Sequence, residues 1–178
     1  MDTLSTVFIA CSLDGYIAGP NGELDWLEMV PNPEGVDTGF GPLMARIDAI
    51  VMGRRTYETV LGFGGEWPYP KPVFVLSNSL KTVPDKLRDR VQLLNGAPQE
   101  VLQTLHARGL HRLYIDGGST IQRFLAAGLI NELIITTVPM LLGGGFPLFG
   151  RLEKPVKWEH LGTEVLLGQL VQSHYKRR

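Results

Sequence analysis

The seven residues 115–121, with the sequence IDGGSTI, constrain the fold of this chain more than any other stretch. An apolar run ends at Ile115 and an amphipathic run begins at Ile121, which predicts a strand, a tight turn and then a helix. Glycine permits positive φ and lets a ligand approach the backbone, while a helix start presents free N–H groups that suit phosphate. The stretch therefore predicts a strand-to-helix junction that can bind phosphate.

A second junction of this kind lies upstream. Residues 49–52 (AIVM) form a short apolar run, and residues 53–56 (GRRT) lead into a helical pattern. The positive charges of Arg54 and Arg55 at a helix start are repelled by the positive end of the helix dipole, and a bound phosphate would offset this repulsion. The two junctions together predict a nucleotide cofactor that is held by its phosphates.

Length, charge and hydrophobic content limit the class of protein. The 178 residues suit a single domain spanning 1–178, and a hydrophobic content of 44% favours a packed core over disorder. The net charge of −1 argues against a general nucleic-acid binder, which usually carries a basic surface. A small-molecule ligand is therefore favoured over a nucleic-acid partner.

The cysteine and histidine patterns predict no metal site. Cys11 is the single cysteine, which excludes an intrachain disulfide and a CxxC site, and the four histidines lack metal-binding spacing. No apolar run approaches the ~18 residues of a membrane-spanning helix, and the N-terminus lacks a signal-peptide pattern. We therefore expect a cytoplasmic protein with no membrane partner.

Apolar strand-like runs alternate with amphipathic runs along the chain. This alternation predicts an α/β fold with three layers, αβα, in which a mostly parallel sheet ends in an antiparallel C-terminal hairpin. Residues 12–39 and 139–150 are expected to be loops, and a loop as long as the first is usually functional or carries short helical turns. The predicted strands are 6–11, 49–52, 72–76, 91–94, 112–116, 133–138, 157–165 and 170–175, and the predicted helices are 40–47, 54–61, 98–108 and 119–128.

Several of these motifs resemble the dihydrofolate reductase superfamily, in the correct order and over nearly the whole chain. Residues 53–58 (GRRTYE) are similar to its cofactor segment after the second strand, and 75–78 (VLSN) to its next cofactor-binding strand end. Residues 129–136 (LINELIIT) resemble the segment after its Gly-Gly loop.

Three further motifs resemble a sister branch, the reductase domain of riboflavin biosynthesis. They are 12–18 (SLDGYIA), the acidic-Gly-Gly signature at 116–118, and 139–144 (PMLLGG). Pro31 stands where dihydrofolate reductases carry a carboxylate, and 53–55 (GRR) replaces the Asp-Asp-Pro of the riboflavin enzyme. No zinc-deaminase signature is present, so the chain looks like a stand-alone reductase domain.

The resemblance implies an NADPH-dependent reductase that transfers hydride to a small heterocycle or a ribosylaminopyrimidine-type substrate, and a homodimer through the C-terminal strands. A dihydrofolate reductase and a non-catalytic nucleotide-binding protein remain alternatives. Arg54 or Arg55 would pair with the 2′-phosphate that distinguishes NADPH from NADH. The expected cofactor-binding residues are Ala10, Ile17, Gly53, Arg54, Arg55, Thr56, Ser77, Asn78, Asp116, Gly117, Gly118, Ser119, Thr120 and Ile121.

The proton that accompanies hydride transfer needs a donor, for which Asp14 and Thr136 are the candidates. Asp14, Trp26 and Thr136 are also the expected substrate-binding residues, with the loop from Asp14 to Trp26 closing over the nicotinamide. The segment 67–70 (WPYP) has two open interpretations, a rigid surface turn or an aromatic rim for the substrate.

Overall fold

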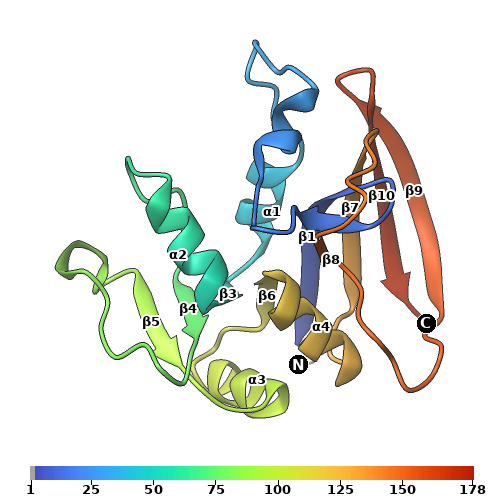
Figure 1. The fold of residues 1–178 in the computed structure, drawn as a ribbon. Coiled ribbons are helices and arrows are strands. Elements are labelled where there is room, and N and C mark those ends of the chain that lie inside the picture. Colours follow the sequence, from blue (N-terminus) through green and yellow to red (C-terminus); the bar gives the residue numbers. More distant parts are fainter. Residues whose placement is uncertain (1–2) are drawn as a thin grey trace.

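The computed structural model describes residues 3–178, and an eight-stranded sheet runs through its centre (Figure 1). The strands up to the sixth in spatial order pair in parallel, and the last two pairings are antiparallel. The mostly parallel sheet predicted from the sequence is thus confirmed. In spatial order the strands are β5 (Val91–Leu94), β4 (Val73–Leu76), β3 (Ala49–Gly53), β6 (Arg112–Asp116), β1 (Leu4–Ser12), β7 (Glu132–Val138), β10 (Leu170–Arg177) and β9 (Trp158–Leu166).

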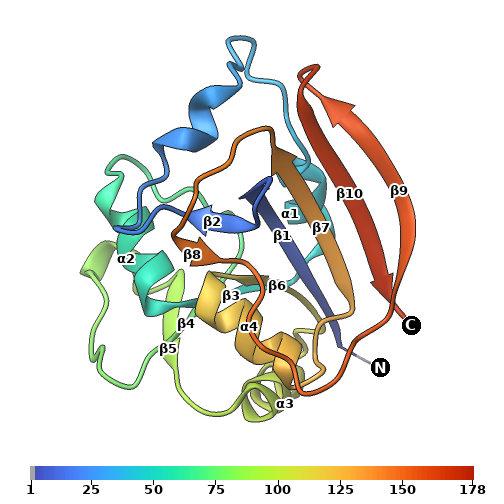
Figure 2. The same ribbon diagram turned by 45° about the vertical axis from the view of Figure 1, so that its right-hand side comes forward.

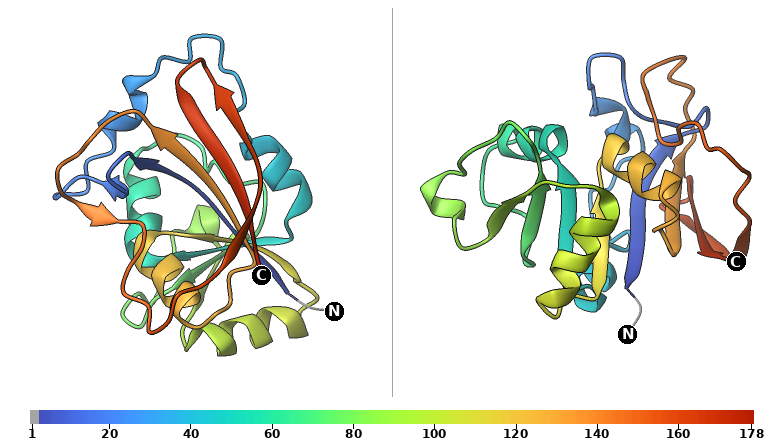
Figure 3. Two further views of the ribbon diagram at one scale, coloured as in Figure 1. Left: turned by 90° about the vertical axis from the view of Figure 1, so that its right-hand side faces the viewer. Right: turned by 90° about the horizontal axis from the view of Figure 1, so that it is seen from below.

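Helices cover both faces of the sheet, which confirms the three predicted layers (Figure 3). Successive residues of a strand point to opposite faces. In β3, Val51 therefore packs with α3 (Pro98–Ala107) and α4 (Gly118–Ala126), while Met52 packs with α1 (Phe40–Arg46) and α2 (Arg54–Gly62). Because both faces are buried, β3 and β4 are apolar throughout instead of alternating with polar residues.

The predicted C-terminal hairpin is confirmed. β9 and β10 pair in antiparallel fashion, and the turn between them places Leu167 and Gly168 at φ of 50° and 71°. β10 also pairs with β7, so the hairpin extends the parallel sheet and leaves β9 as its outer edge (Figure 2). Among the described residues, no helix is long and apolar enough to cross a membrane.

The two predicted loops contain more structure than their sequences indicate. The first carries strand β2 (Tyr16–Ala18) and a 3-10 helix, η1 (Asp25–Met29), and the Gly-rich segment carries strand β8 (Phe146–Pro147). A second 3-10 helix, η2 (Asp85–Leu87), precedes β5. β2 pairs with β8 in a separate two-stranded sheet, visible in Figure 2. Strands this short lack a periodic pattern, so only their pairing across the sequence reveals them.

The β2–β8 pair tolerates no side chain at Gly145. A Cβ there would lie 2.1 Å from the Ala18 carbonyl oxygen, and the residue has a φ of +139°. We predict that Gly145→Ala lowers the free energy of unfolding by about 1–3 kcal/mol through this clash and backbone strain. Urea denaturation measures the change. Gly144→Ala is the control, because a Cβ at Gly144 meets no atom within 4 Å; indistinguishable curves for the two variants would contradict the prediction.

Candidate functional site

The two predicted strand-to-helix junctions meet at the centre of the sheet. β3 and β6 are parallel neighbours, with Met52 opposite Asp116. α2 begins directly after β3, at Arg54, and α4 begins at Gly118, shortly after β6. Because parallel strands end at the same edge, their turns face one crevice, and this is where open α/β sheets bind ligands.

Glycines allow the two junctions to approach closely. Gly117 has a φ of +88°, and a Cβ there would lie 2.4 Å from the Thr56 hydroxyl oxygen. A Cβ on Gly53 would lie 2.9 Å from the hydroxyl oxygen of Thr120. Each junction therefore has a glycine opposite a threonine of the other, and a larger residue at Gly53 or Gly117 would force the junctions apart.

A cavity of about 980 Å³ lies over the junctions. β2 contributes Ile17 to its wall, and the Ile17 Cδ1 atom would lie 2.8 Å from a Cβ on Gly118. The absence of a side chain at Gly118 thus lets β2 close against the start of α4. Eleven of the predicted site residues line this cavity: Ala10, Ile17, Gly53, Arg54, Arg55, Thr56, Asp116, Gly117, Gly118, Ser119 and Thr120.

Three predicted cofactor residues lie outside the cavity lining. The Ser77 hydroxyl accepts a hydrogen bond from the Leu80 backbone N–H at 2.9 Å, and Asn78 is exposed beside it. Ile121 is fully buried in the core. Ser77 therefore stabilises the turn after β4, and Ile121 holds α4 against the sheet.

Asp14, a predicted catalytic and substrate residue, also lies outside the lining. Its carboxylate accepts hydrogen bonds from the Ser12 hydroxyl at 2.6 Å and from the N–H groups of Leu142 and Gly143 at 3.0 and 2.8 Å. The Ser12 hydrogen bond, with smaller contributions from these backbone bonds, lowers the pKa of Asp14 to about 2. These hydrogen bonds connect the loop after β7 to the end of β1.

Trp26 and Thr136, the other predicted substrate residues, are buried with polar partners of their own. The Trp26 indole N–H donates to the Glu23 carbonyl at 3.1 Å, and its ring packs in a small apolar cluster. Thr136 Oγ1 accepts a hydrogen bond from Gln172 Nε2 at 2.9 Å. Neither side chain lines the cavity, and the proton-donor role of Thr136 stays a prediction.

The cavity wall includes residues that the sequence did not single out as site residues. Among these, η1 contributes Leu27, α4 contributes Arg123, and β8 contributes Phe146. Tyr69 is also in the lining, so the aromatic-rim interpretation of residues 67–70 fits its position. Leu27 and Phe146 lie in short elements within the predicted loops, and a local sequence pattern does not show that these elements reach the junctions.

Three arginines line the cavity. Arg54 donates to Ser79 Oγ at 2.9 Å and lies 3.7 Å from the Glu58 carboxylate. The Arg55 guanidinium lies 5.8 Å from the centre of the Phe146 ring, within cation–π range. Both side chains are exposed and retain donor capacity for an anion. Arg123, the third, donates to the Gly96 carbonyl.

Asp116 is a carboxyl group held in the cavity wall at the end of β6. Its Oδ1 accepts the Gly117 backbone N–H at 2.8 Å. Burial raises the pKa of Asp116 to about 6, against the opposing effect of hydrogen bonds from Gly117 and Tyr114. A carboxyl that titrates near neutral pH in a cleft is suited to exchange protons with a ligand.

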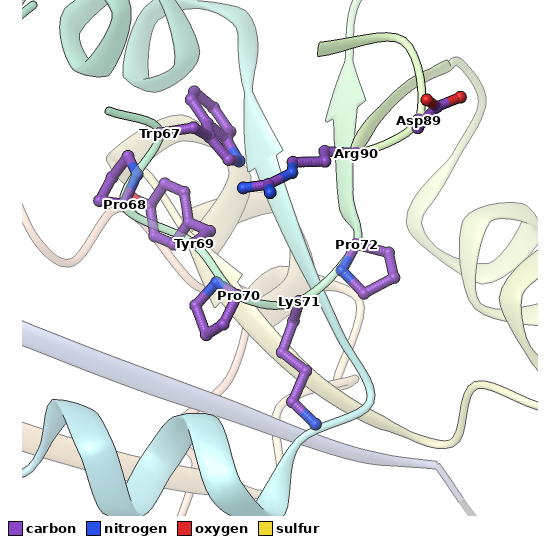
Figure 4. A pocket seen from close by; sticks show the side chains of 8 residues that line it. All are labelled: Trp67, Pro68, Tyr69, Pro70, Lys71, Pro72, Asp89 and Arg90. Atoms are coloured by element: carbon purple, nitrogen blue, oxygen red, sulfur yellow. The ribbon is translucent and has the colours of Figure 1, made fainter. Parts of the chain in front are cut away.

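A smaller cavity of about 520 Å³ lies beside the first, formed largely by the segment 67–72 and two residues that precede β5, Asp89 and Arg90 (Figure 4). Tyr69 lines both cavities and therefore belongs to the wall between them. In Figure 4 the Arg90 side chain extends toward Trp67 and Tyr69. None of the predicted site residues lines this smaller cavity.

The family model of the RibD C-terminal domain matches residues 5–171. The chain belongs to the RibD C-terminal domain family. This finding confirms the resemblance to the riboflavin-pathway reductase domain and supports an oxidoreductase. The RibD-like motifs at 116–118 and 139–144 both fall within the matched range.

The chain is also similar to individual known proteins. A putative riboflavin biosynthesis protein from Shewanella sp. PV-4 is 52% identical, with a TM-score of 0.95 over 98% of this chain and 99% of that one. The uncharacterized protein YwjB of Bacillus subtilis is 34% identical over 99% of both chains. Dihydrofolate reductase from Enterococcus faecalis, complexed with NADP(H), shares the fold at 18% identity and a TM-score of 0.68, covering 98% of this chain and 96% of that one.

The raised pKa of Asp116 predicts a pH-dependent stability difference. The pKa of Asp116 is 3.8 in the unfolded chain and about 6 in the folded protein. Below pH 3.8 the carboxyl is neutral in both states, and its full contribution to the free energy of unfolding is present. As the pH rises through about 6, ionisation favours the unfolded chain and this contribution is lost. Asparagine at position 116 cannot ionise. The free energy of unfolding of Asp116→Asn, measured relative to wild type, should therefore rise by about 2 kcal/mol between about pH 4 and about pH 7.5.

Urea unfolding at several pH values measures this difference. Asp25→Asn, which makes the same substitution at an exposed aspartate of η1, is the control. A pH-independent offset for Asp116→Asn would show that the carboxyl titrates normally in the folded protein.

Proposed function

We propose that this protein is an NADPH-dependent reductase that transfers hydride to a small heterocycle of the ribosylaminopyrimidine type. The observation that carries the proposal is the cavity over two glycine-based junctions, with Arg54 and Arg55 exposed in its wall, in a member of the RibD C-terminal domain family. Such an enzyme acts on soluble metabolites, and we place it in the cytoplasm.

The residues around the cavity fit a dinucleotide. Backbone N–H groups at Gly118, Ser119 and Thr120 begin α4, where free donors and the helix dipole favour a pyrophosphate. Arg54 and Arg55 can pair with a 2′-phosphate through charge-assisted hydrogen bonds. Bound there, the cofactor would supply the hydride.

Apolar residues are suited to hold the nicotinamide. Ala10, Ile17 and Ala18 line the cavity on the β1 and β2 side. β2 closes against α4 at Gly118, and we propose that this contact shields the nicotinamide from water. Exclusion of water protects a hydride donor from side reactions and strengthens electrostatic contacts in the site.

We assign the proton that accompanies hydride transfer to Asp116. Its carboxyl lies in the cavity wall and has a pKa of about 6, so both protonation states are accessible near neutral pH. Asp14 and Thr136 are the donors predicted from the sequence, but neither lines the cavity, and the Asp14 carboxylate accepts hydrogen bonds from Ser12 and the 142–143 backbone. The geometry therefore favours Asp116.

We also propose a homodimer through the C-terminal hairpin. β9 is the outer strand of the sheet, and Leu161 and Val165 on it expose large apolar side chains. An edge strand with exposed apolar residues is suited to pair with another copy. Sedimentation analysis of the purified protein tests this.

The first test of the function is cofactor binding. We predict that NADPH binds more tightly than NADH, and that Arg54→Ala or Arg55→Ala weakens NADPH binding about tenfold while changing NADH binding little, because a charge-assisted bond to the 2′-phosphate is lost. Quenching of tryptophan fluorescence measures both affinities. Arg151→Ala, at an exposed arginine outside the cavity lining, is the control. If wild type bound neither cofactor, the reductase proposal would be abandoned.

The second test is turnover. We predict that 5-amino-6-(5-phosphoribosylamino)uracil supports NADPH oxidation, seen as loss of NADPH absorbance, and that Asp116→Asn lowers kcat about a hundredfold through loss of proton transfer. Oxidation with dihydrofolate instead would favour a dihydrofolate reductase. Tight NADPH binding with neither substrate consumed would favour a non-catalytic nucleotide-binding protein.

A further inference from the structure

Tyr69 is held rigidly in the wall of the large cavity. Its side chain is 8% exposed, and its ring lies 6.3 Å from Phe40 and 5.2 Å from Trp67, measured between ring centres. Trp67 in turn lies 6.0 Å from Tyr57. Figure 4 shows Trp67 and Tyr69 close together on the segment that precedes β4. This row of aromatic rings fixes the direction in which the Tyr69 hydroxyl points.

Among residues 3–178, no hydrogen bond joins the Tyr69 hydroxyl to another residue, and its oxygen is not one of the fully enclosed atoms that lack a partner, so it keeps access to the space around it. Buried tyrosine hydroxyls usually find a hydrogen-bond partner. The Tyr57 hydroxyl also lacks a partner in this part of the chain, but its oxygen is fully enclosed and Tyr57 does not line the cavity. The Tyr69 side chain, by contrast, faces a space large enough for a ligand, which can supply the missing partner.

Tyr69 shares this cavity with Asp116. Burial, with a smaller effect from the negative charge of Asp116, raises the pKa of Tyr69. The hydroxyl therefore stays protonated at the pH values at which an enzyme works and acts as a hydrogen-bond donor. Asp116 accepts the Gly117 N–H at Oδ1, and Tyr114 is the other hydrogen-bond partner of the carboxyl. The Tyr69 hydroxyl and the Asp116 carboxyl line one cavity and can face the same ligand.

We propose that the Tyr69 hydroxyl donates a hydrogen bond to a carbonyl oxygen or ring nitrogen of the substrate heterocycle and so orients that ring beside Asp116. This inference rests on the proposed function and adds a substrate-binding residue to it. A heterocycle without an acceptor at that position would leave the hydroxyl unpaired in the complex, so Tyr69 would also select among substrates.

The test compares Tyr69→Phe with Tyr57→Phe. Both variants remove one hydroxyl from the same row of rings and keep the ring itself, but of the two residues only Tyr69 lines the cavity. The probe is 5-amino-6-(5-phosphoribosylamino)uracil, titrated into protein loaded with NADP⁺. Tryptophan fluorescence detects binding, because Trp67 lies next to Tyr69.

We expect Tyr69→Phe to weaken pyrimidine binding about tenfold, as for the loss of one hydrogen bond to a ligand, with unchanged affinity for NADPH and an unchanged thermal midpoint. Tyr57→Phe should bind the pyrimidine as wild type does. Equal pyrimidine affinity of Tyr69→Phe and wild type overturns this inference alone. A wild-type protein that binds NADPH but no pyrimidine overturns it together with the proposed substrate class.

Discussion

The contact between the two strand-to-helix junctions is the constraint on which the site depends. β3 and β6 lie side by side, and the helices that follow them begin close together. This is possible because Gly53 leaves room for Thr120, and Gly117 leaves room for Thr56. The same lack of side chains exposes backbone N–H groups at the start of α4 and lets β2 approach Gly118. One packing requirement at the centre of the sheet thus creates the cavity floor, the free N–H groups beside it and the contact that closes it.

Closure of the cavity depends on contacts between segments that are far apart in sequence. The Asp14 carboxylate accepts hydrogen bonds from the backbone N–H groups of Leu142 and Gly143, and the adjacent β2 pairs with β8. The carboxylate is exposed yet accepts three hydrogen bonds, which explains why its pKa is lowered. Asp14 therefore contributes to the site by holding its wall together, whereas Asp116 contributes a titrating group to its interior.

The sequence predicts those features that local patterns determine. The apolar runs of the sheet, the helices between them and the two glycine junctions follow from periodicity and turn chemistry, and the structure confirms them. Tyr69 and Phe146 were not assigned to the cofactor site because their positions depend on how distant loops pack. Ser77 was assigned to the cofactor site and Trp26 to the substrate site, but hydrogen bonds to Leu80 and Glu23 use their polar groups.

The place of β1 in the sheet has a consequence for the order of assembly during synthesis. β1 lies between β6 and β7, whose residues are synthesised more than a hundred positions after it. β3, β4 and β5 can pair with one another earlier, but β1 must wait with its apolar faces and both edges uncovered. The nascent chain therefore carries an unpaired, aggregation-prone segment until most of the protein has been made, and this segment is a natural target for a chaperone.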